Sequence, residues 1–288
     1  MAMTKRREDR SPAVTEPRLN AALVVRGAGW TTLTIGVVLA GFVAYELFVT
    51  SFFAGRAQAG LTDDLYERIV AVEVETVAYE EGDLGLVAAP IDIVDDVPLP
   101  SPAAVETALQ TSAGHTDAVA AAASVETGTP EPVEAPAGSI VTEPPALAGD
   151  ALGRIEIPSI GLDWTVVEGV SRSDLRRGAG HMPDTALPGQ PGNAVISGHR
   201  TTYGAPFHEL ADTDKGDLIT VTTASGSHVY QIVRKQIVEP NETWVTGQWE
   251  GSWLTLTTCH PKFSSRQRLI VFARLVGGPN ATTLGAGA

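Results

Sequence analysis

The chain has 288 residues, of which 34 are acidic and 20 are basic, and its formal net charge is −14. This acidity argues against a nucleic-acid-binding protein, because neutralising phosphates requires a basic surface. A single cysteine excludes an intramolecular disulfide framework and any metal site built from several thiolates. Residues 1–62 carry a net charge of +3, residues 63–150 carry −17 and residues 151–288 carry none. This uneven distribution indicates several distinct regions.

The first region combines a basic tail with an apolar stretch. From Gly27 to Tyr45 the sequence holds no charged residue, and as a helix these residues would span about 28 Å. Trp30 and Tyr45 lie near its ends, where aromatic rings favour the membrane interface. We therefore expect a cytoplasmic tail over 1–26 and a transmembrane anchor over 27–55. The basic residues before the anchor predict that the rest of the chain is extracytoplasmic.

Two other interpretations of this stretch remain. A cleaved signal peptide would fit Ala57-Gln58-Ala59 before Gly60, which resembles a small-x-small cleavage site. The apolar stretch resumes at Leu47–Val49 and exceeds the usual length of a signal core, which favours an uncleaved anchor. A buried core helix is disfavoured by the length and by the basic flank.

Residues 56–150 are acidic and rich in Pro and Ala. The spacing of Leu61, Leu65 and Ile69 predicts a short helix within 61–80. Beyond about residue 82, like charge and proline favour a disordered, extended linker, because little apolar surface is available to offset the entropy of ordering. A small folded acidic domain is the alternative.

Residues 151–277 read as an all-β domain, and residues 278–288 read as a flexible tail. Runs of β-branched and aromatic residues alternate with turn signals such as Gly189-Gln190-Pro191-Gly192. No helix-length segment separates consecutive strands, so an antiparallel barrel or sandwich is expected, with short helical turns near 173–177 and 206–212. The expected strands are 154–157, 164–168, 194–197, 218–223, 229–238, 253–258 and 269–276.

Cys259 lies at the end of one of these strands, where Pro261 stops the ladder. Alternation places it on the face opposite Leu256 and Thr258. Free cysteines are often buried and inert. A thiol becomes a nucleophile as the thiolate, and near neutral pH it requires a partner.

Several side chains could assist this thiol. His199 ends an apolar strand at a glycine turn, whereas His228 lies inside a strand and is expected on the surface. His260 neighbours Cys259 and should point to the opposite face. Arg268 opens the next strand after a hairpin-length loop, so its guanidinium could stabilise a thiolate or an oxyanion. Alternatively, Arg268 has only a structural role at the edge of the sheet. Arg266 is a second arginine close by that could be mistaken for it.

These motifs together resemble the sortase family. Thr255-Leu256-Thr257-Thr258-Cys259, with Arg268 following and Ser197-Gly198-His199-Arg200 preceding, is similar to the family's Thr-Leu-x-Thr-Cys signature and its catalytic histidine. The resemblance covers residues 152–276. It implies a closed eight-stranded β-barrel that cleaves a C-terminal sorting signal between Thr and Gly and transfers the protein to an amine of a cell-wall precursor. Cys259 would be the nucleophile, His199 the general acid and base, and Arg268 the oxyanion holder.

The segment from His199 to Phe207 further resembles class E sortases of high-GC Gram-positive bacteria. This resemblance implies Leu-Ala-x-Thr-Gly signals on surface proteins, and it makes Tyr203 and Thr258 candidate substrate contacts. No cofactor and no metal are expected, since Asp212, Asp214 and Asp217 form only a weak acidic group. The expected partners are therefore signal-bearing surface proteins, a cell-wall amine and the membrane.

Two other functions stay open on the sequence alone. An L,D-transpeptidase-like enzyme also orders His before Cys, but it would carry Ser-x-Gly-Cys in place of Thr257-Thr258-Cys259. The second open function is a membrane-tethered binding module with an inert barrel. Such a module would not need Cys259, His199 and Arg268 together.

Overall fold

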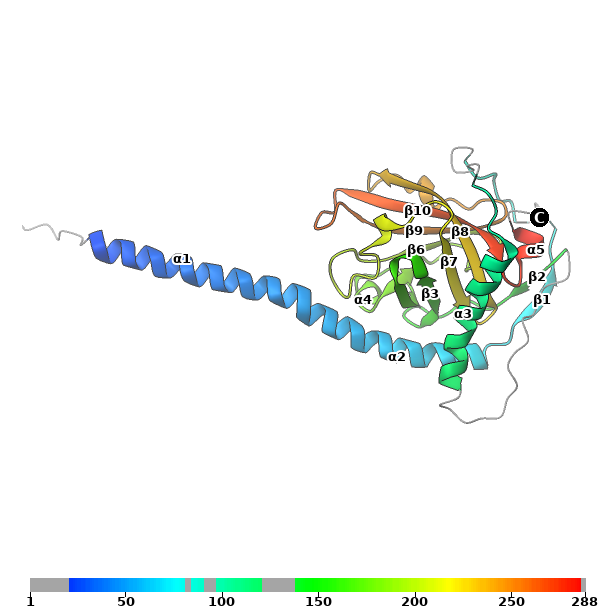
Figure 1. Cartoon of the computed structure of the whole chain (residues 1–288), viewed down its shortest axis with the longest axis horizontal. Helices are drawn as coiled ribbons and strands as arrows, with labels where there is room; N and C mark the ends of the chain where they lie inside the picture. Colours follow the sequence, from blue (N-terminus) through cyan, green and yellow to red (C-terminus); the bar gives the residue numbers. More distant parts are fainter. Residues whose placement is uncertain (1–20, 81–83, 91–96, 121–137, 286–288) are drawn as a thin grey trace, which may run out of the picture. The chain divides into compact units, whose positions relative to one another are not determined.

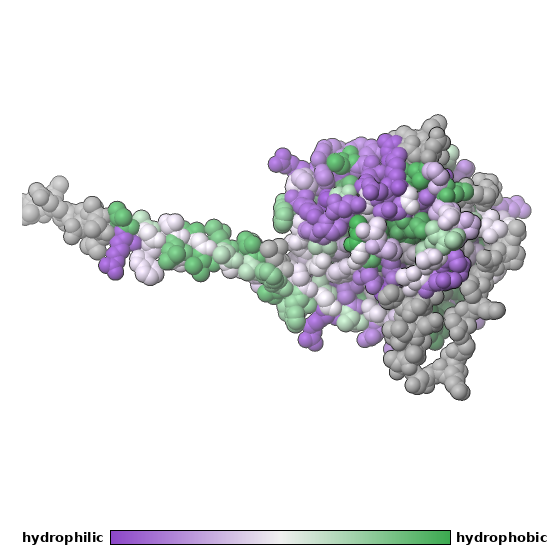
Figure 2. Space-filling view, in the orientation of Figure 1, coloured by the Kyte–Doolittle hydropathy of each residue, from purple (hydrophilic) through white to green (hydrophobic). Residues whose placement is uncertain are grey.

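The computed structural model describes residues 21–80, 84–90, 97–120 and 138–285. It consists of two compact units, Met1–Tyr45 and Glu46–Ala288. In its described part the first unit is helix α1 (Ala21–Ala44), which is mostly green and white in the hydropathy view of Figure 2. The segment Val25–Ala44 is long and apolar enough to cross a membrane, and none of it is buried. Most of the expected cytoplasmic tail lies outside the described residues.

The second unit is built around a closed barrel of eight strands in the order β10-β8-β7-β3-β4-β5-β6-β9 (Figure 1). The predicted all-β, eight-stranded closed barrel is therefore confirmed. The strands are β3 (Ala151–Ile157), β4 (Leu162–Glu168), β5 (Ala179–His181), β6 (Gly192–Ser197), β7 (Leu218–Thr223), β8 (Gly226–Val238), β9 (Ser252–His260) and β10 (Gln267–Gly277). The short helices among them are η2 (Pro158–Ile160), α4 (Arg172–Leu175), η3 (Leu210–Asp212) and η4 (Thr243–Thr246).

Two strand pairs in the barrel are parallel, which the sequence did not predict. Strand β4 pairs in parallel with β5, and β6 pairs in parallel with β9. The first crossover runs through α4, and the second runs through the β7–β8 hairpin on the far side of the barrel. Strand β5 was not expected, because Ala179–His181 is short and has no β-branched residue to favour a strand.

The barrel interior is filled by aliphatic side chains that alternate along the strands. Leu254 and Leu256 of β9 and Leu269 and Val271 of β10 belong to one buried cluster. Each such side chain contributes about 1.5–3 kcal/mol by leaving water. Residues on the opposite face of β9 and β10, such as Trp253 and Phe272, pack in a second cluster outside the barrel. Buried residues on both faces hold the strand ends rigidly.

Helix α2 (Thr50–Ala71) packs along the outside of the barrel. Leu61 and Leu65 are buried against Ala151 and Val167. The side chain of Gln58 donates to the carbonyls of Thr165 (3.0 Å) and Arg177 (2.9 Å) and accepts from the amide of Thr165 at 2.8 Å.

These contacts correct the expected boundaries of the helix. The helix begins and ends earlier than the expected 61–80. Residues 50–55, expected in the anchor, belong to its first turns, and Thr50 and Ala54 are buried. The reason is that the apolar face of α2 finds its burial against β3 and β4.

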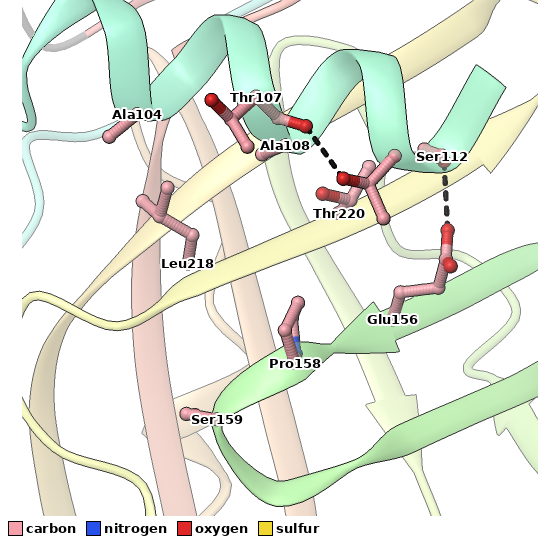
Figure 3. A pocket seen from close by; sticks show the side chains of 10 residues that line it. Ala104, Thr107, Ala108, Ser112, Glu156, Pro158, Ser159, Leu218 and Thr220 are labelled. Atoms are coloured by element: carbon pink, nitrogen blue, oxygen red, sulfur yellow. Dashed lines mark hydrogen bonds between the residues drawn. The ribbon is translucent and has the colours of Figure 1, made fainter. Parts of the chain in front are cut away.

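The expected extended linker is folded onto the barrel in its described residues. Strand β1 (Glu75–Ala78) pairs with β2 (Ser139–Thr142), and helix α3 (Pro102–Ala120) lies beside β7 and β8. Ser112 of α3 donates to a carboxylate oxygen of Glu156 at 2.8 Å. Small side chains of α3 line a pocket against β3 and β7 (Figure 3). Its volume is about 390 Å³. Small residues let α3 approach the barrel closely, so this segment packs despite its low content of large apolar residues. The rest of the expected linker, residues 121–137, lies outside the described residues.

The C-terminal segment, expected as a flexible tail, is also packed as far as it is described. Asn280 accepts a hydrogen bond from the amide of Val141 (2.7 Å) and donates to the carbonyls of Val141 and Gly189. Leu284, in helix α5 (Ala281–Leu284), is buried in the barrel's core cluster. The tail is ordered because its one asparagine satisfies backbone groups of β2 and of a barrel loop.

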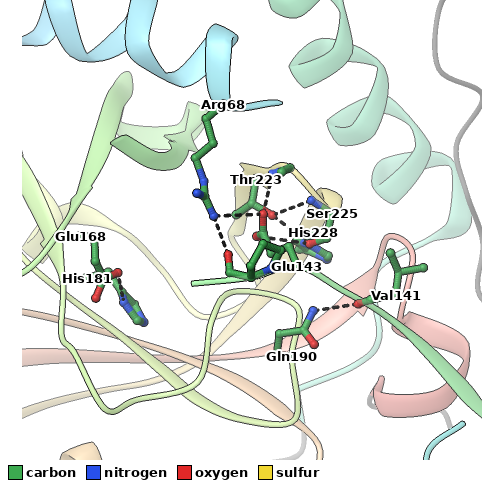
Figure 4. A network of polar contacts seen from close by, with 11 residues as sticks. Arg68, Val141, Glu143, Glu168, His181, Gln190, Thr223, Ser225 and His228 are labelled. Carbon is green, nitrogen blue, oxygen red and sulfur yellow. Dashed lines mark hydrogen bonds and ion pairs between the residues drawn. The ribbon is translucent and has the colours of Figure 1, made fainter. Parts of the chain in front are cut away.

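His228 is fully buried, so the expectation of a surface residue was wrong. Its Nε2 lies 3.1 Å from the hydroxyl of Ser225, within the polar network of Figure 4. Glu143, which follows β2, accepts from the amide of Ala224 and lies 3.8 Å from Arg68 of α2. The segment after β2 thus contacts the turn between β7 and β8, next to His228. Burial lowers the pKa of His228 to about 4.

Candidate active site

Cys259 lies at the end of β9, on the outward face of the barrel. The strand is flanked by β6 on one side and by β10 on the other. Leu254, Leu256 and Thr258 alternate into the interior, and Cys259 is half-buried and unpaired as a free thiol. Its position at the strand end, before Pro261, gives it a rigid support and an open side.

Arg268 is placed next to Cys259 by the β9–β10 pairing. The two residues are direct partners across the antiparallel ladder. Directly opposed residues have their side chains on the same face, with Cβ atoms about 4.5–5.5 Å apart. The guanidinium of Arg268 donates to the carbonyls of Ser265 (2.9 Å) and Gln267 (3.0 Å). These bonds orient the cation at the mouth of the β9–β10 loop.

His199 approaches Cys259 from the other side through the parallel β6–β9 pairing. Ser197 of β6 is paired with Thr257 of β9. The ladder continues for one residue, because the amide of Gly198 donates to the carbonyl of Thr257 at 3.1 Å. His199 follows Ser197 at the same offset at which Cys259 follows Thr257, and paired strands lie about 4.8 Å apart. Cys259 of β9, its cross-strand partner Arg268 of β10 and His199, which follows the end of β6 by two residues, are therefore found at the same end of three neighbouring strands, which we call the rim.

A cation and an aromatic ring adjoin His199. The ring of Tyr203 lies 5.0 Å from the imidazole, centroid to centroid. The guanidinium of Arg176, next after α4, lies 5.4 Å from the centroid of the Tyr203 ring. Burial, and then the positive charge of Arg176, lower the pKa of His199. The imidazole is therefore biased toward its neutral form, which accepts a proton from a thiol.

The loop after His199 is held in a conformation that few residues adopt. Tyr203, Gly204 and Ala205 have φ values of +53°, +75° and +47°. A Cβ atom on Gly204 would lie 2.4 Å from the ring of Trp164 in β4. The loop therefore rests directly on β4, and this contact sets the position of Tyr203.

Arg200 links the loop to the end of β9. It is buried, and its Nη1 donates to the carbonyl of Cys259 (3.3 Å) and to Nδ1 of His260 (2.9 Å). The carbonyl of Arg200 in turn accepts from Nδ1 of His208 at 2.7 Å. Sequence reasoning did not assign roles to Arg200 or Arg176. The adjacency of Arg200 to His199 was a usable signal, whereas nothing in the sequence connects Arg176 with the rim.

The remaining histidines have other partners. His260 and His208 bond Arg200, so neither is free to serve the thiol. His181 of β5 is buried and lies 2.7 Å from a carboxylate oxygen of Glu168. His228 lies in the network of Figure 4, near the turn between β7 and β8. Of the histidines considered, His199 is the one that follows the end of β6, the strand paired in parallel with β9.

Thr258, predicted as a substrate contact, lies in the interior. It is buried, and its hydroxyl donates to the carbonyl of Gly198 at 2.7 Å. This bond ties β9 to the segment that carries His199, so the side chain braces the rim from behind. The prediction placed it on the wrong side because the sequence resemblance carries no information on which face a signature residue uses. Tyr203, in contrast, is half-buried at the rim.

Among the described residues no group of three His, Cys, Asp or Glu side chains could hold a metal ion. Of the three aspartates noted in the sequence, Asp217 accepts from the hydroxyl of Ser159 (2.7 Å) and from the amide of Asp214 (2.9 Å). The cavity beneath α3 in Figure 3 is lined by β3 and β7 and includes none of the rim residues.

Residues 155–276 match the family model described as the sortase domain. Over 133 residues the chain is 37% identical to sortase D of Bacillus subtilis, a match that covers 44% of this chain and 65% of that protein. It is 31% identical to sortase SrtE1 of Streptomyces coelicolor, with 44% and 41% covered. The matches thus span from under half to about two thirds of these curated relatives.

Solved structures of sortases are also similar. A sortase D5 transpeptidase of Clostridium perfringens is 31% identical, with a TM-score of 0.43 and coverage of 46% of this chain and 83% of that one. A sortase E variant of Streptomyces avermitilis is 33% identical, with a TM-score of 0.41 and coverage of 45% and 90%. The matched region holds all eight barrel strands except the first residues of β3 and the last of β10. The chain belongs to the sortase family.

Proposed function

We propose that the protein is a membrane-anchored cysteine transpeptidase that cleaves a sorting signal between Thr and Gly and transfers the new carboxyl end to an amine. The observation that carries this proposal is the register of β6, β9 and β10. It supports the proposal because Cys259 pairs with Arg268 across β9 and β10, and His199 follows β6, the other neighbour of β9.

The first half of the reaction is thioester formation. Cys259 attacks the carbonyl carbon of the signal's threonine as its proton passes to neutral His199. The carbonyl oxygen becomes an oxyanion, which the fixed cation of Arg268 stabilises. When the C–N bond to glycine breaks, its electron pair takes the proton from the His199 imidazolium, and the glycine amine leaves. The threonine remains bound to sulfur as a thioester.

The second half reverses these roles. An incoming amine of a cell-wall peptide attacks the thioester carbonyl, and His199 accepts the proton that the amine loses. Arg268 again faces the oxyanion. Collapse of the intermediate releases the sulfur of Cys259, which recovers its proton from His199, and an amide bond joins protein and acceptor.

The signal is proposed to be of the Leu-Ala-x-Thr-Gly type. Support comes from the resemblance of the His199–Phe207 segment to class E sortases and from the position of Tyr203 beside His199. Helix α1 would anchor the protein with its N-terminus in the cytoplasm and its barrel on the outer face. The apolar, unburied segment Val25–Ala44 and the basic residues before it support this orientation.

A peptide assay on the full-length protein in detergent tests the proposal. A quenched Leu-Ala-x-Thr-Gly peptide and an amine such as triglycine should give cleavage at Thr–Gly and an amide product. A matched peptide with alanine in place of the threonine should stay intact. Both products should disappear in Cys259→Ala. Reversible binding without cleavage of any Thr-Gly peptide would overturn the proposal in favour of an inert module.

A further inference from the structure

Helix α2 runs along the barrel from the rim to the opposite end (Figure 1). At its start, the Cβ of Ala54 lies 3.3 Å from where a Cβ of Gly204 would stand, in the loop after His199. At its end, Arg68 pairs with Glu143, which contacts the turn between β7 and β8. That turn is the far end of β8 from Val238, the partner of Arg268. The chain therefore enters the barrel unit at the rim.

The first turns of α2 carry an aromatic surface. Phe52 and Phe53 are 61% and 63% exposed, and their rings lie 5.7 Å apart. The opposite face of the same turns is buried, through Thr50 and Ala54. Packing on the barrel therefore fixes the direction in which the two rings point, which is away from the protein.

Basic side chains accompany these rings. Arg56 is exposed one turn later on α2. Arg172 and Arg176 are exposed on the α4 segment, which contacts α2 through the bond from Gln58 to the carbonyl of Arg177. Asp174 is the one acidic residue within α4, and it caps the helix by accepting from the amide of Ser171. The acidic residues of α2 itself, which are Asp63, Asp64 and Glu67, lie in the half of the helix away from the two rings. We call Phe52, Phe53, Arg56, Arg172 and Arg176 the aromatic–basic patch.

We propose that the aromatic–basic patch docks on the anionic surface of the lipid bilayer and holds the rim against the membrane. The occupant is lipid because only the five residues Tyr45–Val49 separate the start of α2 from the apolar helix α1, which is proposed to cross the membrane. Aromatic rings favour the headgroup region, and each nearby basic residue adds attraction to anionic lipid. Without a long tether, the active site meets its substrates within the headgroup layer, where membrane-held signals and lipid-linked acceptors reside.

Energy transfer from the protein to the bilayer measures this orientation. Full-length protein with Cys259→Ala is given one new cysteine, either Ser265→Cys at the rim or Thr282→Cys beyond β10. Each is labelled with a donor and reconstituted in vesicles with acceptor headgroups and about one third phosphatidylglycerol. The labels differ in height by the axial length of β10, roughly 28 Å for a strand tilted by about 40°. Transfer should therefore be higher from position 265.

The patch is tested by Phe52→Gln with Phe53→Gln, which should lower transfer from position 265 roughly twofold because the rim leaves the interface. Val70→Gln is the matched control, since Val70 is 87% exposed on the same helix but at its far end, and it should change nothing. Energy transfer from the label at position 265 should also be lower with vesicles made only of neutral lipid. Equal transfer from positions 265 and 282, or no effect of the double substitution, would overturn the proposal.

This inference rests on the membrane crossing of α1, which belongs to the proposed function, so the two must fail separately. With Cys259 intact, Phe52→Gln with Phe53→Gln should leave cleavage of a soluble peptide unchanged, because neither ring belongs to the rim. Normal cleavage with an undisplaced rim would refute the docking alone. If the wild-type protein does not cleave the peptide, the enzyme proposal is refuted. The energy-transfer measurement still tests the docking proposal.

Discussion

Cys259 and Arg268 are direct cross-strand partners at the open end of the β9–β10 ladder. Their shared face is outward, while Thr258 and Leu269, the next pair, point into the barrel. The thiol and the cation are thus held by the sheet itself, and a slip of one residue would send one of them inside.

Replacement of Arg268 by alanine should lower kcat/KM for the signal peptide by a factor of about 10²–10³, the usual effect of losing one oxyanion donor. Thermal unfolding should change little, because the side chain bonds only its own loop. Arg266→Ala is the matched control, since Arg266 is exposed on the same loop. Equal losses in the two variants would show that Arg268 has no special part in the reaction.

Replacement of Arg176 by glutamine should raise the pKa of His199, because the neighbouring cation disfavours the imidazolium. The protonated form of His199 would then persist to higher pH. In the pH dependence of kcat/KM, the limb that reports His199 should therefore move to higher pH. Burial still keeps the pKa of His199 below its ordinary value. Arg172→Gln, also exposed on α4, should leave the limb in place. A limb that stays fixed or moves to lower pH in Arg176→Gln contradicts the assigned electrostatics.

Substitution of Gly204 by alanine should disable the rim more than it destabilises the fold. The new methyl group would collide with the Trp164 ring, so the loop that carries Tyr203 must move away from His199. Strain at a positive φ accounts for about 1–2 kcal/mol of unfolding free energy. Gly216→Ala isolates that strain, since its φ is +93° with nothing within 4 Å of the new Cβ. Activity should fall sharply in the first variant alone, and comparable activity in both would exclude a positioning role for this contact.

His228 makes stability depend on acid. Its folded pKa is about 4, below the ordinary 6.5, because burial disfavours the charged form. The unfolded chain therefore binds the proton more readily, and stability is present above pH 6.5 and lost as pH falls toward 4. The loss attributable to this residue is about 3 kcal/mol.

Urea unfolding followed by tryptophan fluorescence at pH 7 and pH 4 measures this loss. His228→Gln should remove most of the difference, whereas His208→Gln, at a half-exposed side chain, should retain it. An unchanged pH dependence in His228→Gln would mean that the imidazole titrates normally within the fold.

The barrel could be predicted from the sequence because it depends on local patterns, whereas the roles of Cys259, His199 and Arg268 stay predictions. The β-branched runs mark seven of the eight strands, and the end of β9 is marked by Pro261. The juxtaposition of Cys259 with Arg268 follows from a hairpin, whose register depends on nearby residues. His199 was singled out because it ends an apolar strand at a glycine turn, whereas the parallel pairing of β6 with β9 leaves no signal in the spacing.

Features set by distant contacts could not be predicted. The imidazole of His228 lies against Gly189, where an added Cβ would stand 2.1 Å from the ring, and no local pattern predicts this contact. Arg176, which follows α4, lies over the ring of Tyr203 and lowers the pKa of His199, and no sequence pattern connects it with either residue. The helix was predicted too late in the chain because the prediction followed the spacing from Leu61 onward. Gln58, which precedes that spacing, supplies three hydrogen bonds to the barrel.

The most direct measurement of the central claim is the intact mass of the protein after brief reaction with a signal peptide and an acid quench, without an added amine. The expected result is an adduct whose mass corresponds to the peptide up to and including its threonine, and digestion should map it to Cys259. The adduct should be missing in Cys259→Ala and should disappear when an amine is added later. Cleavage of the peptide with no such adduct, or an adduct on any other residue, would contradict the central claim.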